Sequence, residues 1–60
     1  MTQSRTVLVT GAFGNLGQMV VAELKQRDYR VLAMDLDNPR NRQVAAKMTA
    51  LCDEVAWGDL

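Results

Sequence analysis

Three glycines recur at intervals of three residues near the amino end of the chain. They are Gly11, Gly14 and Gly17, within the stretch TGAFGNLG. An apolar run precedes them and a helical pattern follows, which is the setting of the dinucleotide-binding fingerprint. There the first glycine makes a tight turn, the second lets a pyrophosphate lie against bare main chain, and the third allows close packing. The alternative is a glycine-rich turn that binds no ligand.

The two residues after the middle glycine would begin the helix. Main-chain N–H groups in the first turn of a helix have no partner within the helix, and the helix dipole places positive charge there. The N–H groups of Asn15 and Leu16 would therefore face a bound phosphate. This arrangement predicts a diphosphate site at the start of the helix.

An acidic residue follows the second apolar run at Asp35, 18 residues after Gly17. A carboxylate there can accept hydrogen bonds from both hydroxyls of an adenosine ribose and would repel the 2′-phosphate of NADP. Arg40 and Arg42 lie just beyond and could pair with such a phosphate. The simpler interpretations are a solvated turn for Asp35 and a solvated helix start for the arginines. We predict NAD as the cofactor, with NADP as the less favoured alternative.

The elements that must position these residues follow from apolar periodicity. Strand-like runs cover residues 6–10, 29–35 and 54–57. A helix is expected from Asn15 to about Arg27, with an apolar stripe made of Leu16, Met19, Val20 and Leu24. A second helix should begin after an Asn38 cap with Pro39 in its first turn and run to Cys52 or Asp53. Its expected apolar stripe is Val44, Met48, Leu51 and Cys52.

The element order β-α-β-α-β predicts an α/β fold with a parallel three-stranded sheet of the Rossmann type. Right-handed crossovers put both helices on one face of that sheet and leave the other face uncovered. The first strand would also have an unpaired edge. We therefore expect residues 1–60 to be part of a dinucleotide-binding domain, the first half of a doubly wound sheet. The remainder of such a domain, or a second copy of the chain, would cover the open face.

The motifs together resemble those of a known family. VTGAFGNLG at the amino end, the Asp that closes the second strand and the GDL that closes the third resemble the extended and atypical short-chain dehydrogenases/reductases, the NAD-dependent epimerase/dehydratase group. Classical members of that superfamily have glycine where this chain has Asn15. The resemblance implies that Leu36 and Asp37 line the adenosine, and that Asp59 meets the adenine amino group with Leu60 beside the ring. For Asp59 the simpler alternative is a strand-end turn.

The expected cofactor-binding residues are therefore Gly11, Phe13, Gly14, Asn15, Leu16, Gly17, Asp35, Leu36, Asp37, Asp59 and Leu60. The resemblance also implies a Tyr-x-x-x-Lys pair for hydride transfer, which in a full-length member lies beyond residue 60. Lys25 and Tyr29 have that separation in the reverse order. They belong to the opposite rim of the sheet from the cofactor, which binds where strands end. We therefore expect no catalytic residue in this chain.

Two functions remain open at this point. One is the cofactor-binding part of an NAD-dependent oxidoreductase, epimerase or dehydratase that acts on a hydroxyl or ketone substrate. The other is a non-catalytic dinucleotide sensor of the NmrA type. A stand-alone module that binds nothing is a third, simpler possibility.

Composition excludes several other classes. Seven basic and seven acidic residues balance, so no broad field would attract nucleic acid or an anionic membrane. The longest apolar runs are far too short for a membrane span, and we expect a cytoplasmic protein. The single cysteine, Cys52, and the absence of histidine exclude an internal disulfide, a Cys/His zinc site and a histidine base. Cys52 is expected to be a small core residue.

Overall fold

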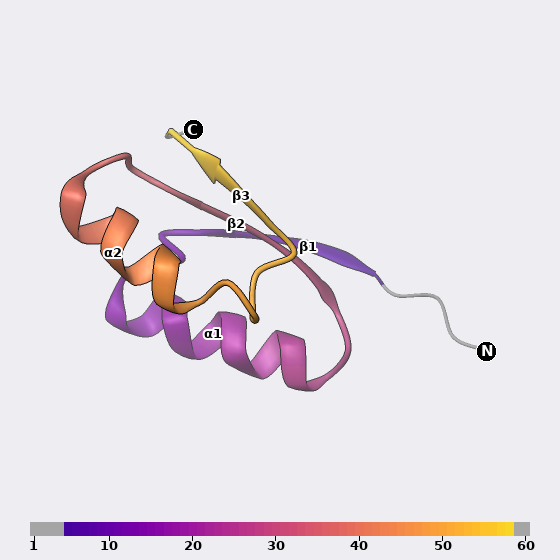
Figure 1. The fold of residues 1–60 in the computed structure, drawn as a ribbon. Helices are drawn as coiled ribbons and strands as arrows, with labels where there is room; N and C mark the ends of the chain where they lie inside the picture. Colours follow the sequence, from indigo (N-terminus) through magenta and orange to yellow (C-terminus); the bar gives the residue numbers. More distant parts are fainter. Residues whose placement is uncertain (1–4, 59–60) are drawn as a thin grey trace.

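Three strands alternate with two helices in the computed structural model, which describes residues 5–58 (Figure 1). The elements are β1 (Thr6–Thr10), α1 (Asn15–Gln26), β2 (Arg30–Asp35), α2 (Pro39–Lys47) and β3 (Glu54–Trp57). The predicted β-α-β-α-β order and the Rossmann-type arrangement are confirmed. The predicted α2 start is also confirmed, because the Asn38 side chain accepts a hydrogen bond from the Asn41 N–H at 2.8 Å.

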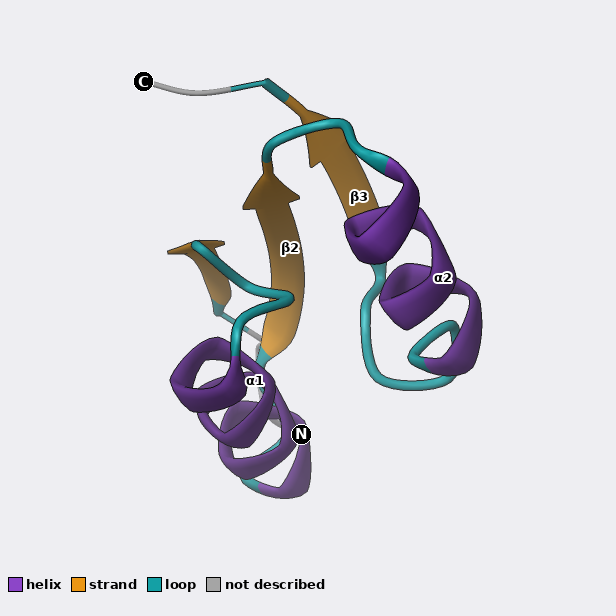
Figure 2. Ribbon diagram, turned by 90° about the vertical axis from the view of Figure 1, so that its left-hand side faces the viewer, coloured by secondary structure: helices purple, strands orange, loops and turns teal. Residues whose placement is uncertain are grey.

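The strands form one parallel sheet in the order β1-β2-β3, so β2 lies in the middle. Val7 pairs with Val31, and Ala33 pairs with both Val9 and Val55. Both helices lie on the same face of the sheet (Figure 1). Figure 2 shows α1 along β1 and β2 and α2 nearer to β3. Because the strands are parallel, their carboxyl ends share one rim of the molecule.

The core lies between this sheet face and the two helices. It combines residues of the strands, of the turn after β1, of α1 and of the segment after α2, namely Val9, Ala12, Phe13, Val21, Val31, Ala33 and Met48. Side chains of neighbouring strand positions alternate between the two faces. The face away from the helices accordingly carries Leu8, Leu32, Met34 and Ala56. Leu8 is among the exposed large apolar side chains.

The apolar stripe expected on α1 is wrong at three exposed positions, which are Leu16, Met19 and Val20. Leu16 is 73% exposed and Met19 is 69% exposed. The helix instead turns Gly17 toward the preceding turn, and Val21 and Leu24 follow Gly17 on the same side of the helix. Val21 is fully buried and Leu24 packs against the core. The face of α1 that packs against the core therefore begins at Gly17. Glycine is not counted as an apolar residue, so the apolar pattern does not reveal this face.

The second helix is shorter than expected, because α2 ends at Lys47 and not at Cys52 or Asp53. The Met48 N–H bonds to the Ala45 carbonyl at 3.0 Å, and the N–H groups of Leu51 and Cys52 then bond to the Met48 carbonyl. These tight turns redirect the chain toward β3 while Met48 stays buried and Leu51 and Cys52 pack against the core. The apolar periodicity continues beyond the end of α2, so the helix length predicted from it was too long.

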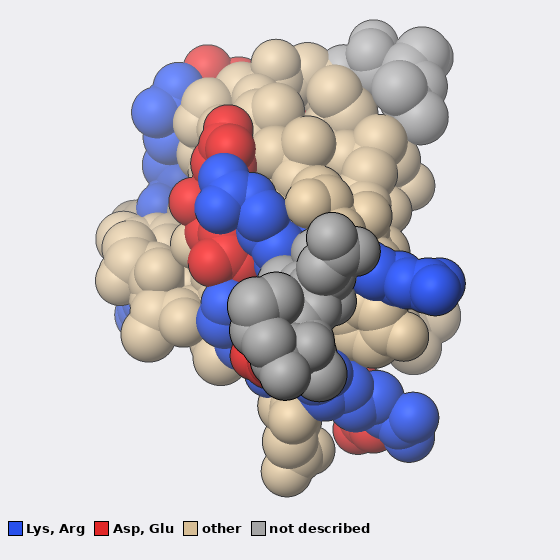
Figure 3. Space-filling model, turned by 90° about the vertical axis from the view of Figure 1, so that its right-hand side faces the viewer, with Lys and Arg blue, Asp and Glu red and all other residues tan. Residues whose placement is uncertain are grey.

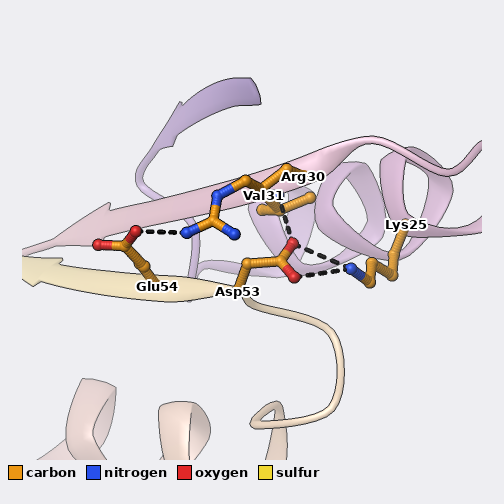
Figure 4. A network of polar contacts seen from close by, with 5 residues as sticks. All are labelled: Lys25, Arg30, Val31, Asp53 and Glu54. Carbon is orange, nitrogen blue, oxygen red and sulfur yellow. Dashed lines mark hydrogen bonds and ion pairs between the residues drawn. The ribbon is translucent and has the colours of Figure 1, made fainter. Parts of the chain in front are cut away.

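Charged side chains of both signs gather at the rim where β2 and β3 begin (Figure 3). Lys25 Nζ, in the last turn of α1, lies 2.9 Å from both carboxylate oxygens of Asp53. Asp53 Oδ2 also accepts a hydrogen bond from the Val31 N–H at 2.7 Å, and Arg30 Nη2 lies 2.6 Å from Glu54 Oε2 (Figure 4). Asp53 therefore ties the end of α1 to the start of β2.

The Asp53 carboxylate should make the stability of the chain depend on pH in acid. The hydrogen bond from the Val31 N–H, followed by that from Lys25, holds the pKa of Asp53 below its ordinary value of 3.8. A lowered folded-state pKa contributes stability above the unfolded-state pKa, and this contribution is lost as pH falls through the folded-state value. We expect the urea midpoint of Asp53→Asn to fall less than that of the unmodified chain between about pH 5 and pH 2.

The matched control for this prediction is Glu23→Gln, which removes an exposed α1 carboxylate that pairs with Arg27, the C-cap residue of that helix. Exposed pairs of this kind contribute little to stability. Parallel pH profiles for the unmodified chain and Asp53→Asn would contradict the role assigned to Asp53.

Within residues 5–58, no helix has the length and apolar character that crossing a membrane requires.

Candidate functional site

The turn after β1 occupies the rim where the strands end. Gly11 has a φ of 63°, in the left-handed region that side-chain-bearing residues rarely adopt. The Gly14 N–H donates to the Gly11 carbonyl at 3.2 Å, and the Ala12 N–H donates to the Met34 carbonyl at 3.2 Å. The first bond closes the turn and the second attaches it to the end of β2. The tight turn predicted at Gly11 is therefore present.

Gly14 and Gly17 differ in what surrounds them. A Cβ added at Gly14 would meet one atom, the Gly11 carbonyl oxygen, at an ordinary contact distance of 3.5 Å. A Cβ added at Gly17 would collide with that same oxygen and lie 2.8 Å from Ala12 Cα and 2.9 Å from Ala12 C. Gly17 therefore allows α1 to pack against the turn, whereas the chain itself leaves space beside Gly14. This open space is the kind of cradle that a pyrophosphate needs.

The first turn of α1 is free of the groups that would compete with an anion. Gly14 is the N-cap residue, makes no side-chain cap hydrogen bond, and has an extended backbone. No acidic residue lies in the first turn, which contains Asn15 and Leu16. By contrast, α2 is capped by its own Asn38. The N–H groups at the start of α1 can therefore donate hydrogen bonds to an anion, whereas one of those at the start of α2 already donates to Asn38.

Asp35 lies at the end of β2 with its carboxylate directed toward the glycine turn. Its Oδ2 accepts a hydrogen bond from the Phe13 N–H at 3.0 Å, and its Oδ1 accepts one from the Leu36 N–H at 2.8 Å. A carboxylate offers about four acceptor positions, so each oxygen retains capacity for another donor. The solvated-turn interpretation of Asp35 does not account for this long-range bond, which joins residues 22 positions apart.

Two side chains outside the set of expected cofactor-binding residues converge on the Phe13 carbonyl. Gln18 Nε2 donates to it at 3.0 Å from α1, and Arg40 Nη1 donates to it at 2.9 Å from α2. Arg40 Nη1 also bonds to Asn41 Oδ1 at 3.0 Å. Arg40 is exposed, as a solvated helix start would be, but that interpretation does not account for its bonds to Phe13 and Asn41. No spacing rule connects residues 13, 18 and 40, so the sequence offered no signal for this contact.

Arg42 is engaged as well, although its side chain is 55% exposed. Its guanidinium lies 4.4 Å from the centroid of the Trp57 ring and pairs with both carboxylate oxygens of Asp37 at 2.7 and 2.8 Å. This hydrogen-bonded guanidinium lowers the pKa of Asp37 below its ordinary value. The Trp57 ring in turn lies 5.4 Å from the Phe13 ring, centroid to centroid. Asp37 and Arg42 thus form an exposed ion pair beside β3.

The other predicted site residues lie near the same rim. Leu36 is 51% exposed immediately after Asp35, so an apolar side chain is available there. The Gly58 N–H donates to the Asp35 carbonyl at 3.0 Å, which brings the last described residue beside the end of β2. Asp59 and Leu60, the residues predicted to contact adenine, lie outside the described residues.

Lys25 and Tyr29, the reversed pair, lie on the opposite rim. Lys25 is paired with Asp53, and the Tyr29 N–H bonds to the Leu24 carbonyl just before β2. Burial raises the pKa of the Cys52 thiol, which disfavours the reactive thiolate and agrees with a packing role. Among residues 5–58, no cluster of three or more metal-ligating side chains occurs.

Residues 7–60 match the model of the NAD dependent epimerase/dehydratase family, so the match runs from β1 through the glycine turn and Asp35 to the last residue. No curated protein and no solved structure gives a significant match. The description of the family implies a nicotinamide dinucleotide as cofactor and does not distinguish NAD from NADP. Because the match covers nearly all of the sequence, the chain belongs to the NAD dependent epimerase/dehydratase family.

Proposed function

We propose that the chain binds the adenosine diphosphate part of NAD at the rim formed by the glycine turn and the end of β2. In this proposal Gly11, Gly14 and Gly17 shape the turn, and the N–H groups of Asn15 and Leu16 bind the pyrophosphate. Phe13 holds the turn through its main chain, as its hydrogen bonds indicate. Asp35 binds the ribose hydroxyls, Leu36 and Asp37 line the adenosine, and Asp59 and Leu60 contact the adenine.

The observation that carries the proposal is the contrast between Gly14 and Gly17. Packing within the chain explains the absence of a side chain at Gly17, because a Cβ there would collide with the turn. Packing does not explain it at Gly14, where a Cβ would fit and the backbone has ordinary extended angles. A ligand that must approach the main chain supplies the missing reason, and the uncapped start of α1 supplies donors for a phosphate.

NAD is the proposed dinucleotide because of how the charged side chains are engaged. The Asp35 carboxylate, at the end of β2 beside the glycine turn, would accept ribose hydroxyls and repel a 2′-phosphate. Arg42 is committed to Asp37 and Trp57, and Arg40 to Phe13 and Asn41. Neither arginine would therefore be free to pair with a 2′-phosphate without giving up bonds that it makes here.

Calorimetric titration of the chain with ADP-ribose tests the proposed site directly. We expect saturable binding with one site per chain. Absence of saturation at millimolar ADP-ribose would favour a module that binds no dinucleotide and would overturn the proposal.

The preference for NAD predicts the effect of Asp35→Ala. Hydrogen bonds to a charged group contribute about 1.5–3 kcal/mol, so loss of those to the ribose should weaken NAD binding by about 10–100-fold. NADP binding should weaken less, because the same change removes the repulsion of its 2′-phosphate. The loosening of the Phe13 bond affects both cofactors alike, so the ratio of the two dissociation constants isolates the ribose contact. Equal losses for NAD and NADP would contradict the preference.

We further propose that the chain provides cofactor binding to an oxidoreductase, epimerase or dehydratase that acts on a hydroxyl or ketone substrate. No residue between 5 and 58 is assigned a catalytic role. When bound, the nicotinamide would supply hydride transfer, and the residues described here would hold the opposite end of the dinucleotide.

A further inference from the structure

The peptide groups on either side of Phe13 are held by side chains from three different elements. The Phe13 N–H donates to Asp35 of β2, and the Phe13 carbonyl accepts from Gln18 of α1 and Arg40 of α2. The Phe13 ring is fully buried and lies against Trp57. The residue just before Gly14 is therefore fixed by its side chain, its N–H and its carbonyl.

Arg40 is the most distant of these contributors, since 27 positions separate it from Phe13. Its own position is set by Asn41, which is only 4% exposed. Asn41 Oδ1 accepts from Arg40, and Asn41 Nδ2 donates to the Leu36 carbonyl at 2.8 Å. A continuous path of hydrogen bonds thus runs from the loop after β2, through Asn41 and Arg40, to the glycine turn.

We infer that Arg40 is a positioning residue, which fixes the pyrophosphate-binding turn through the Phe13 carbonyl and couples it to the adenosine-binding loop after β2. The inference rests on the proposed function and adds a residue that binds no part of the cofactor. The Phe13 carbonyl belongs to the same peptide group as the Gly14 N–H. A bond from a guanidinium to this carbonyl is charge-assisted and stronger than the neutral bond from Gln18. Arg40 therefore sets the orientation of the peptide group that leads into α1.

Arg40→Ala tests this inference when dissociation constants are measured for ADP-ribose, NAD and NADP. We expect all three to rise by a similar factor, about tenfold, which is the effect of losing one charge-assisted bond. Gln18→Ala, the matched loss of the neutral donor, should raise them less. Arg40→Lys, which keeps a cationic donor, should recover part of the affinity. A loss confined to NADP would show that Arg40 contacts the 2′-phosphate instead, and unchanged affinities would overturn the inference outright.

A second measurement separates this inference from the proposed function. In the ligand-free chain, Arg40→Ala should shift the amide NMR signal of Gly14 while the signals of Val21 and Val31, in the core, stay in place. If the Gly14 signal did not move, the inference that Arg40 positions the glycine turn would be overturned, even if the chain binds ADP-ribose. Should the unmodified chain fail to bind ADP-ribose, the proposed function falls while the shift still reports the contact. If Arg40→Ala does not fold, Arg40→Gln, which removes the charge but keeps a long side chain, is measured by the same two criteria.

Discussion

Gly14→Val is expected to weaken dinucleotide binding by about 10–100-fold or more while leaving the fold intact. The backbone at Gly14 is extended, with φ −76° and ψ 172°, and a Cβ there lies at an ordinary contact distance from the Gly11 carbonyl oxygen. The side chain would instead fill the space proposed for the pyrophosphate. Overfilling a fitted site costs about 1–3 kcal/mol or more, which corresponds to a loss of about 10–100-fold or greater in affinity.

Calorimetric titration with ADP-ribose measures this loss, and urea denaturation establishes that the variant remains folded. Gly14→Ala provides a graded version, with a smaller obstruction and a smaller loss. Unchanged affinity in Gly14→Val would show that no ligand approaches the main chain at this residue.

Gly17→Ala should have the opposite effect, a loss of stability that does not depend on any ligand. The added methyl group would overlap the Gly11 carbonyl oxygen and lie within 3 Å of the Ala12 backbone. These are backbone atoms, which cannot rotate away as a flexible side chain would. Overpacking of this kind costs about 1–3 kcal/mol and sometimes more. Since a core of this size provides only about 3–5 kcal/mol, this cost is a large fraction of the total, and the variant should unfold at a much lower urea concentration than the unmodified chain.

Circular dichroism across a urea series measures the effect, and Gly14→Ala is the matched control because it makes the same chemical change three residues earlier. The control should unfold at nearly the same urea concentration as the unmodified chain. Equal stability of the two variants would mean that α1 does not pack against the turn as described.

The strands were predictable because each is a short apolar run bounded by polar or turn-forming residues. The start of α2 was predictable for a similar reason, since Asn38 and Pro39 act within a few residues of one another. These features depend on local sequence. The shared side of the helices followed from the handedness of the crossovers, which is general to parallel sheets.

The buried face of α1 could have been predicted but was assigned incorrectly. The close-packing role expected of Gly17 conflicts with an apolar stripe that includes Leu16, Met19 and Val20. A helix that packs closely at Gly17 must present the residues one and two turns later, Val21 and Leu24, on the same side. The stripe was instead assigned from the spacing of the apolar residues alone, without this geometric requirement. The lesson applies to any helix that begins with a glycine motif, because glycine contributes contact without hydrophobicity.

The contacts of Arg40 and Gln18 with Phe13 could not be predicted from the sequence. They depend on where α2 lies relative to the turn, which is a property of the packed structure and not of local spacing. The same is true of Arg42, whose partners Asp37 and Trp57 belong to different elements. Charged residues near a helix start have many possible partners, and only the three-dimensional arrangement selects among them.

The hydrogen bonds at Phe13 also bear on the thermodynamics of association. Ordering a loop when a ligand arrives costs conformational entropy, which is subtracted from the affinity that the contacts provide. In this chain the turn is already bonded at the Phe13 N–H, at its carbonyl and at the Gly14 N–H. Its entropy is therefore lost during folding, so the free energy of each contact with a ligand goes into affinity and not into arranging the receptor.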